Sequence, residues 1–315
     1  MTSTHQPLFL LCETPMHAGS GSDLGLIDLP IQRERHTQFP KVEGSGLKGS
    51  LRQAFEEAAG SDTNKLKYIH HYFGFDKEAA EQQKIDKDFK EDEREYKGCI
   101  SVTDARLLLF PVKSQRGVFA WVTCTRVYQK FVEEMTMIGQ SSLPNTLTTN
   151  TTGSDSELFV AKSGTKGKIG LEEFIYADIN ENADVTTFGE YLGNQLFGTD
   201  AIYSNVKESL RKNIVVLGND DFTYFVRNCT EVITRTKINN ETGTVAQGAL
   251  FNEEYLPQES ILYSMAFFDK QFKKDGASEA TVKQFFNEML PQYFQLGGNA
   301  TIGKGIMRTN KKSNA

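Results

Sequence analysis

A glycine-rich segment close to the C-terminus, "GGNATIGKGIM", has residue types suited to holding phosphate. Gly298, Gly303 and Lys304 match the phosphate-loop pattern G-x-x-x-x-G-K-[ST], but Gly305 replaces the final Ser or Thr. A nucleotide-binding loop joins a strand to a helix, whereas this segment follows a predicted helix and only eleven residues come after Lys304. We therefore reject a nucleotide hydrolase. Backbone N–H groups among these glycines suit the phosphates of a nucleic-acid backbone, and a plain flexible connection is the alternative.

A second cluster with phosphate-binding chemistry runs from His17 to Arg52. It contains a glycine-rich loop with Asp28, the basic run "QRERH" and the start of a predicted helix. Lys48 and Arg52 are four residues apart, so they share one face of that helix. Two cations on one face either bind phosphates or form an ordinary solvated basic face. These residues alone leave both interpretations open.

The charge of the chain is unevenly distributed along the sequence. The net charge is −6, yet residues 28–52 carry +2 and the last fifteen residues carry +4. Residues 76–96 hold nine acids against five bases. Binding to a polyanion depends on local clusters of Lys and Arg more than on the total charge. The acidic total therefore does not exclude a nucleic-acid partner.

The composition is typical of a globular protein of the reducing cytoplasm. The residues are 38% hydrophobic and 24% charged, and no stretch approaches the roughly 18 apolar residues of a membrane span. The start, "MTSTHQPLFLLCETP", lacks the basic region and the apolar length of a signal peptide. The four cysteines lie far apart without a C-x-x-C pair, which favours neither zinc nor disulfides. We expect a cytoplasmic protein with no membrane partner.

The elements that must position these residues favour an α+β fold. An apolar strand at 7–13 precedes a helix at 45–60, for which Ser45 is the candidate N-cap. Two β-rich runs at 99–112 and 117–125 then predict a hairpin, and a helix follows at 126–138. Strand, helix, hairpin and helix in this order are typical of a ferredoxin-like βαββαβ unit.

Other segments interrupt or extend this unit. Residues 61–97 are highly charged with mixed signs and predict a helical, solvent-facing insertion. Residues 138–215 are assigned to a second insertion, which begins with a polar loop. Runs of β-type residues on both sides of Asn240–Gly243 predict a projecting hairpin. A buried strand at 260–269 and a helix at 279–298 are predicted to lead into the glycine-rich segment.

Several long motifs in fixed order resemble the repeat-associated mysterious protein (RAMP) superfamily of CRISPR effectors. The motifs are "IDLPIQRERHTQFP", "SGLKGSLR", "ISVTDARLLLFPVKSQRGVFAWVTC", "GALFNEEYLP" and "GGNATIGKG". They are most similar to the repeated backbone subunit of the type III-B (Cmr) complex, over residues 8–308. The resemblance implies a single domain over 1–315, built as a ferredoxin-like (RRM-type) palm with helical insertions. It also implies a protruding β-hairpin thumb, here residues 230–257.

The resemblance further implies an RNA-guided endoribonuclease that is also a scaffold. Copies of the subunit would line up head to tail along a CRISPR RNA, beside other Cmr subunits, and cut complementary target RNA at six-nucleotide intervals. Cleavage in this family requires a divalent metal, so Mg²⁺ or Mn²⁺ is the implied cofactor, with unknown ligands. The alternative is a sheathing scaffold that binds RNA without cutting it. A guide-processing nuclease is less favoured, because the chain has only five histidines.

Three residues match catalytic or near-catalytic positions of the family. Asp28 falls at the position of the catalytic aspartate, and Asp23 in the same loop serves as a control outside that position. Asp28 would orient the ribose 2′-OH, act as base or acid, or bind the metal, whereas a loop-capping role is the structural alternative. His17 would touch RNA or assist proton transfer, or be a structural loop residue. Glu231, at the thumb base, is a weaker candidate beside the cleaved phosphate.

The resemblance assigns the remaining candidates to RNA binding. Lys48 and Arg52 would hold guide phosphates as a point charge and a bidentate fork. Some of the basic residues in "QRERH" would face RNA. The full predicted set is Ser45, Lys48, Arg52, Arg33, Gly297, Gly298, Thr301, Gly303, Lys304 and Gly305.

Overall fold

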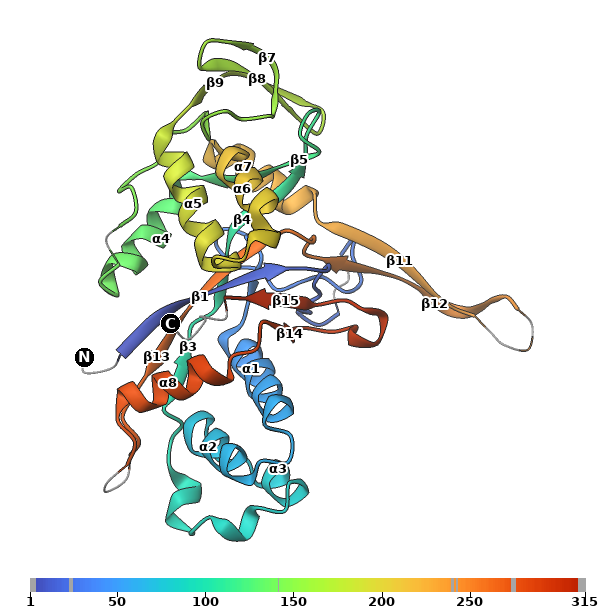
Figure 1. Ribbon diagram of the computed structural model, residues 1–315. Coiled ribbons are helices and arrows are strands. Elements are labelled where there is room, and N and C mark those ends of the chain that lie inside the picture. The colour runs from blue at the N-terminus through green and yellow to red at the C-terminus, as the bar shows by residue number, and fades with distance from the viewer. Residues whose placement is uncertain are drawn as a thin grey trace.

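The computed structural model describes residues 4–22, 25–140, 142–238, 241, 243–272 and 276–310. Its central unit, the palm, is built from segments at both ends of the chain (Figure 1). These palm elements are β1 (Thr4–Cys12), α1 (Gly44–Ala59), β4 (Ala105–Lys113), β13 (Ile261–Phe268), α8 (Glu279–Met289) and β15 (Ile306–Thr309).

The four palm strands lie in the spatial order β15-β1-β13-β4, and every neighbouring pair is antiparallel. Helix α1 follows β1 in the chain, and α8 lies between β13 and β15. This is the arrangement of a βαββαβ unit, so the predicted ferredoxin-like α+β class is confirmed. The prediction for the second half of the unit was wrong, because β13 and α8 fill the places assigned to 117–125 and 126–138.

The two displaced segments form β5 (Phe119–Cys124) and α4 (Thr125–Met137), which lie outside the palm unit. Strand β5 pairs with the outer edge of β4, whereas β13 pairs with both β1 and β4. Every residue of β13 except Phe267 is buried, as expected for a strand with neighbours on both sides. Local hydrophobic pattern does not decide which of two apolar strands takes the central place.

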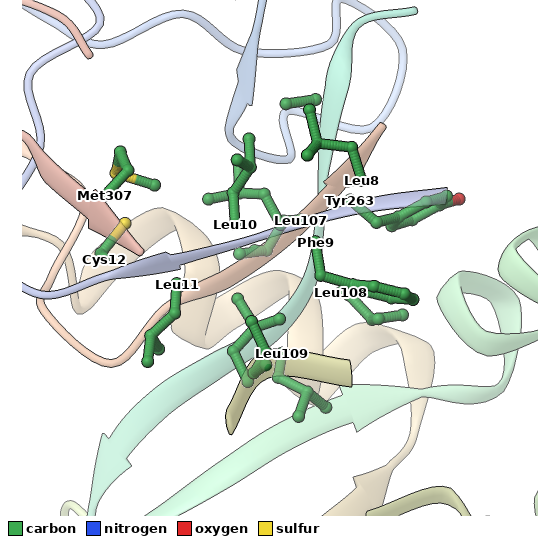
Figure 2. Packing of buried hydrophobic residues seen from close by; sticks show 14 of the residues in the cluster. Leu8, Phe9, Leu10, Leu11, Cys12, Leu107, Leu108, Leu109, Tyr263 and Met307 are labelled. Atoms are coloured by element: carbon green, nitrogen blue, oxygen red, sulfur yellow. The ribbon is translucent and has the colours of Figure 1, made fainter. Parts of the chain in front are cut away.

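The core of the palm surrounds β1. Residues Leu8–Cys12 are each at most 4% exposed. They lie among Leu107–Leu109 of β4, Tyr263 of β13 and Met307 of β15 (Figure 2). A strand covered on both faces carries apolar residues at every position, which explains why the unbroken run "LFLLC" predicts this strand.

Beyond β5 the sheet continues in the order β10-β6-β9-β8-β7. Most of this extension lies within the predicted insertion 138–215, whose boundaries stay a prediction. None of the helices in the described ranges has the length and apolar character to cross a bilayer. The remaining elements are β2 (Lys41–Val42), β3 (Ile100–Val102), β6 (Thr151–Thr152), β7 (Phe159–Ser163), β8 (Lys166–Leu171), β9 (Phe174–Glu181), α5 (Ala183–Phe197), α6 (Ser204–Lys212), β10 (Ile214–Leu217) and α7 (Asn219–Asn228), with a 3₁₀ turn at Ala201–Tyr203.

The thumb is a two-stranded hairpin that projects away from the rest of the molecule (Figure 1). It consists of β11 (Glu231–Ile238) and β12 (Val245–Tyr255), paired antiparallel outside the main sheet. Its position agrees with the hairpin predicted from the sequence. Of the predicted turn 240–243, only Glu241 and Gly243 belong to the described residues.

The glycine-rich segment connects two strands. Helix α8 ends at Met289, before Pro291, because a proline disfavours helical conformation in the residue that precedes it. Residues Tyr293–Gln295 form β14, which pairs antiparallel with β15, and the turn between them includes a 3₁₀ turn at Ala300–Ile302. The helix predicted over 279–298 was therefore wrong in its second half. The strand-loop-strand order again excludes a nucleotide-binding loop.

The charged insertion is helical, as predicted, and one buried histidine anchors it to α1. It contains α2 (Thr63–Phe73), α3 (Lys77–Gln82) and 3₁₀ turns at Asp86–Asp88 and Asp92–Glu95. His70 Nε2–H donates to Gln83 Oε1 at 3.1 Å, and His70 Nδ1 accepts from the Arg52 guanidinium at 3.1 Å. Burial lowers the pKa of His70, so the ring is held neutral.

We predict that acid destabilises this anchor. The pKa of His70 is lower in the folded chain than in the unfolded one. The neutral ring therefore contributes its full stabilisation above a pH of about 6.5, and this stabilisation is lost as the pH falls below that value. The urea midpoint of the protein should therefore drop between neutral pH and about pH 5, and less so for His70→Gln. His36→Gln, at an exposed histidine, is the control. Equal drops in the wild type and His70→Gln would contradict this account.

Candidate functional site

Two neighbouring residues of β12, Glu253 and Glu254, are buried carboxylates at the base of the thumb. Their exposed fractions are 4% and 2%. Successive residues of a strand point to opposite faces, so these two side chains organise opposite sides of the thumb base. A buried charge requires ion pairs or hydrogen bonds, and the partners of these two carboxylates outline the site.

Glu254 holds the N-terminal loop against the thumb. Its carboxylate accepts hydrogen bonds from the Ile31 amide at 3.0 Å, from Thr230 Oγ1 at 2.7 Å and from Arg33 Nη2. Arg33 Nη1 also donates to the carbonyls of Gln38 and Val226. Three hydrogen bonds thus hold the Arg33 guanidinium within the chain, so it is a weaker candidate for RNA binding than a cation without such partners.

Asp28 lies at the head of this loop, beside β12. Its Oδ2 accepts a hydrogen bond from the Asn252 amide at 2.7 Å, while the residue as a whole is exposed. The next residue, Leu29, pairs in parallel with Glu253. The structure therefore places the sequence-predicted carboxylate on the thumb strand itself, with access to solvent. Asp23 lies outside the described residues.

Glu253 organises the opposite side of the thumb base. It accepts hydrogen bonds from Tyr255 Oη at 2.6 Å, Asn299 Nδ2 at 2.6 Å and Arg235 Nη1 at 2.8 Å. Burial alone would raise the pKa of Glu253, but these hydrogen bonds outweigh it and hold the pKa below its ordinary value. Burial, with the nearby Glu253, raises the pKa of Tyr255 to about 12. The result is an ionised carboxylate with its partners fixed around it.

His17 belongs to this second network. Its Nδ1–H donates to the Glu254 carbonyl at 2.7 Å, and its Nε2 lies 3.7 Å from Glu253 Oε1. The ring is 5.6 Å from that of Tyr255, and only 9% of the residue is exposed. The hydrogen bond at Nδ1 fixes which ring nitrogen faces Glu253. His17 therefore has a structural role in this conformation, and its predicted contact with RNA stays untested.

The glycine-rich hairpin loop packs on His17, and close backbone contacts explain two of its glycines, Gly297 and Gly305. The Gly298 amide donates to the His17 carbonyl at 2.9 Å, and the Gly305 amide donates to the Pro15 carbonyl at 2.9 Å. A Cβ at Gly297 would come within 2.4 Å of the His17 carbonyl oxygen, and φ there is 81°. A Cβ at Gly305 would come within 2.2 Å of a carbonyl oxygen. Close backbone contact inside the protein is thus sufficient to require glycine at these two positions, and their predicted contact with RNA stays a prediction.

The exposed part of this loop retains candidates for phosphate binding. Thr301 and Gly303 are exposed, and the Gly303 amide donates to the Ala300 carbonyl. The Lys304 ammonium lies 4.8 Å from the centre of the Tyr255 ring, a cation–π contact. Lys304 thereby joins the loop to the thumb base. The cradle of backbone amides predicted from the glycines is largely taken up by internal bonds, so side chains are the better candidates.

Glu231, the first residue of the thumb, pairs across the hairpin with Tyr255. Burial raises the pKa of Glu231, and the nearby Lys304 partly offsets that effect. A carboxyl group with a raised pKa is partly protonated closer to neutral pH and so suits proton donation. The structure brings Glu231, His17 and Lys304 together around Tyr255, and their predicted roles toward RNA stay predictions.

The basic face of α1 forms a separate part of the site, and its residues differ in how far they are available to bind a phosphate. Glu43 and not Ser45 is the N-cap, so that prediction was wrong; Ser45 is exposed one residue into the helix. Lys48 is half-buried, and burial and the adjacent Arg52 lower its pKa. Arg52 donates to Glu56 Oε1, the Gly74 carbonyl and His70, so its fork is used within the protein.

Sequence reasoning missed four residues of the thumb-base network: Arg235, Glu253, Tyr255 and Asn299. One signal was present in "ALFNEEYLP", where two acids interrupt an otherwise β-type run. Acidic residues are depleted in strands, so an adjacent pair there indicates a specific environment. Nothing in the sequence connects that pair to Asn299. This residue of the C-terminal loop has a left-handed backbone (φ 67°), and its side chain donates to Glu253.

The described residues contain no group of three or more His, Cys, Asp or Glu side chains that could hold a metal ion. Asp28 supplies a single exposed carboxylate. Mg²⁺ in phosphate chemistry is commonly held by one or two carboxylates together with substrate phosphates. The described part of the chain therefore does not form a self-contained metal centre.

The palm, the thumb and the loops at its base define a RAMP-type subunit. The pattern of the RAMP superfamily matches residues 9–308, so the chain belongs to that superfamily. The chain is 34% identical over 303 residues to the CRISPR system Cmr endoribonuclease Cmr4 of Pyrococcus furiosus, covering 95% of this chain and 92% of that protein. It is 25% identical to the CRISPR system CMR subunit Cmr4 of Saccharolobus solfataricus, covering 96% and 94%.

Solved structures agree with this assignment. Oligomeric Cmr4 from Pyrococcus furiosus superposes with a TM-score of 0.66 at 26% identity, covering 98% of both chains. A chain of the type III-B Cmr-beta complex bound to cognate target RNA gives a TM-score of 0.68 at 20% identity, covering 97% of this chain and 96% of that one. At that identity the second similarity concerns the fold alone.

We predict that Arg52 and Lys48 differ in their effect on stability. Arg52→Gln removes one contact within α1 and two contacts that join α1 to the helical insertion, and it should lower the free energy of unfolding by about 2 kcal/mol. Lys48→Gln removes an ammonium whose burial is unfavourable, so stability should stay the same or rise. Urea denaturation of both variants checks this. If Lys48→Gln lowered the free energy of unfolding and Arg52→Gln left it unchanged, Lys48 and not Arg52 would be the residue that stabilises the fold.

Proposed function

We infer that the chain is a repeated backbone subunit of a type III-B CRISPR effector and an RNA-guided endoribonuclease. It would bind CRISPR RNA and cut complementary target RNA, acting in the cytoplasm beside other copies of itself and other Cmr subunits. The observation that carries this proposal is the placement of Asp28, whose exposed carboxylate is held by the Asn252 amide of the thumb strand. Membership of the RAMP superfamily and the similarity to a Cmr endoribonuclease support it.

The outer face of the thumb that continues toward Asp28 suits bases better than phosphates. Residues that pair directly across the hairpin share a face, and the pairs Thr234–Asn252, Thr236–Leu250 and Ile238–Val245 are uncharged. The exposed fractions of Ile238, Val245 and Leu250 are 49%, 50% and 64%. An uncharged, partly apolar surface offers no positive charge to a phosphate but can pack against an unstacked base. Leu250 is thus better placed than Phe251, which lies on the opposite face, to pack against an unstacked base.

A displaced nucleotide beside Asp28 would allow the ribose 2′-OH to attack in line. A regular A-form helix holds the 2′-OH away from the line of the leaving 5′ oxygen, so positioning of this kind contributes several kcal/mol to catalysis (on the order of 7–11 at most). In the proposed step Asp28 takes the 2′ proton, the 2′ oxygen bonds to phosphorus, and the bond to the 5′ oxygen breaks. Glu231, whose pKa burial raises, is the candidate proton donor to that oxygen. The products carry a 2′,3′-cyclic phosphate and a 5′-hydroxyl.

Two parts of the proposal come from the family resemblance. One is the requirement for Mg²⁺ or Mn²⁺, for which RNA phosphates would have to supply ligands beyond the chain's own. The other is the head-to-tail filament along the guide with cleavage every six nucleotides. An open repeating assembly follows when one surface binds a different surface of the next copy.

We predict that Asp28→Asn abolishes cutting without abolishing binding. Loss of the proton acceptor should slow cleavage of a complementary RNA by at least about 10²-fold in the assembled complex, while affinity for that RNA stays unchanged. Denaturing gels of end-labelled target and a filter-binding assay provide the two measurements. Asp23→Asn, in the same loop, is the matched control.

The possible outcomes separate the candidate functions. Persistent cutting by Asp28→Asn with intact binding would refute the catalytic assignment. Product ends with a 3′-hydroxyl and a 5′-phosphate would exclude attack by the 2′-OH. A wild-type complex that binds target and never cuts it would identify a sheathing scaffold instead.

A further prediction concerns the salt dependence of RNA binding. Lys48 and Lys304 make no ion pair with a carboxylate in the described ranges, and each is available to one phosphate. Neutralising either residue to Gln should flatten the slope of log affinity against log salt concentration by about 0.7 on single-stranded RNA. Lys212→Gln, at a lysine that pairs with Glu208, should leave the slope unchanged. Unchanged slopes in Lys48→Gln and Lys304→Gln would indicate an ordinary solvated basic face.

A further inference from the structure

The loop that carries Asp28 runs beside the thumb strand as a short extra strand. The Leu29 amide donates to the Asn252 carbonyl at 3.0 Å, and the Glu254 amide donates to the Leu29 carbonyl at 3.0 Å. Two residues further, the Ile31 amide donates to the Glu254 carboxylate at 3.0 Å. The contact between Asp28 and Asn252 is therefore the outer end of a ladder whose inner end is the Glu254 side chain.

Glu254 connects this ladder to three separate parts of the molecule. Arg33, which binds the carboxylate, also donates to the Val226 carbonyl at 2.9 Å, so it joins Glu254 to α7. Thr230 Oγ1 donates to the same carboxylate and directly precedes β11. One buried side chain thus ties the Asp28 loop to the end of β12, the start of β11 and helix α7.

We propose that Glu254 is the positioning residue for Asp28, and that it couples the orientation of the thumb to the catalytic loop. The proposal rests on the function proposed above. Glu254 has 2% of its surface exposed and so does not touch RNA. It acts through Ile31 and Arg33, which fix the register of the loop against β12. When the loop is held in this register, the Asp28 carboxylate accepts from the Asn252 amide. When the register is lost, the Asp28 carboxylate can rotate away from that amide.

The two oxygens of the Glu254 carboxylate are essential to this role. It accepts from three donors, and a Gln side chain offers one oxygen and one NH₂ in place of two oxygens. One of the donors, Ile31 N–H or the Arg33 guanidinium, would then face another donor. Glu253 cannot replace it, because its carboxylate points to the opposite face and is already bound by Tyr255, Arg235 and Asn299.

Glu254→Gln in the assembled complex tests the proposal. The single-turnover rate of target cleavage should fall about 10–100-fold, because displacement of a catalytic group by roughly 1 Å has effects of this size. The affinity for a target with 2′-deoxyribose at the cleaved positions should match the wild type. Such a split between rate and affinity would not arise from a general loss of structure.

Two further variants make the result decisive. Glu181→Gln breaks an ion pair with Lys162 in the extension of the sheet and should leave the cleavage rate unchanged. Thr230→Val removes one hydrogen bond to Glu254 and should give a smaller loss of rate in the same direction; it decides the matter if Glu254→Gln fails to assemble. Cleavage at the wild-type rate, or affinity reduced as much as rate, overturns the positioning role. A wild-type complex that never cuts defeats the proposed function itself.

Discussion

The burial of two adjacent carboxylates on one strand is the constraint on which the site depends. Removing a carboxylate from water costs several kcal/mol unless partners compensate, and Glu253 and Glu254 are both nearly inaccessible. Their partners come from the N-terminal loop, from β11 and from the C-terminal hairpin loop. The carboxylates of β12 therefore have all their partners only when segments as distant in sequence as Ile31 and Asn299 have assembled around the strand. The site is a property of the complete palm.

This arrangement separates the parts of the site by chemistry. Cations that are free to meet phosphates lie on α1 and on the C-terminal loop, at Lys48 and Lys304. The thumb face that leads to Asp28 is uncharged along its outer pairs. If the RNA backbone binds along Lys48 and Lys304 and one base is displaced along the thumb, the ribose between that base and the backbone would lie at Asp28. In this proposal the position of the cut follows from the distance between two surfaces and not from the base sequence.

The sequence predicted those features that depend on local chemistry or long motifs. The hydrophobic run of β1, the stop of α1 at Gly60, the helical insertion and the thumb hairpin all carry local signals. The central place of β13, 140 residues or more after β4, does not, because it depends on which apolar strand finds two neighbours. The same holds for the site: Asp28 was identified by its motif, whereas its partner Asn252 and the anchors Glu253 and Glu254 required the fold.

The contacts of Arg33 and Arg52 show why the spacing of basic residues in a sequence does not reveal which of them are available to bind RNA. The planar fork that suits arginine to a phosphate suits it equally to a carbonyl–carboxylate pair inside the protein. Arg33 and Arg52 are both used in this way, each bound to a carboxylate and at least one carbonyl. Lys41 is also ion-paired within the protein, so Lys48 and Lys304 are the cations that the proposal assigns to RNA, as point charges without a fixed hydrogen-bond geometry. Contacts of that kind depend on the phosphate and not on the base, and they tolerate small shifts in register. A subunit that repeats along guides of any sequence requires that tolerance, so the loss of the arginines to internal bonds is consistent with the proposed role.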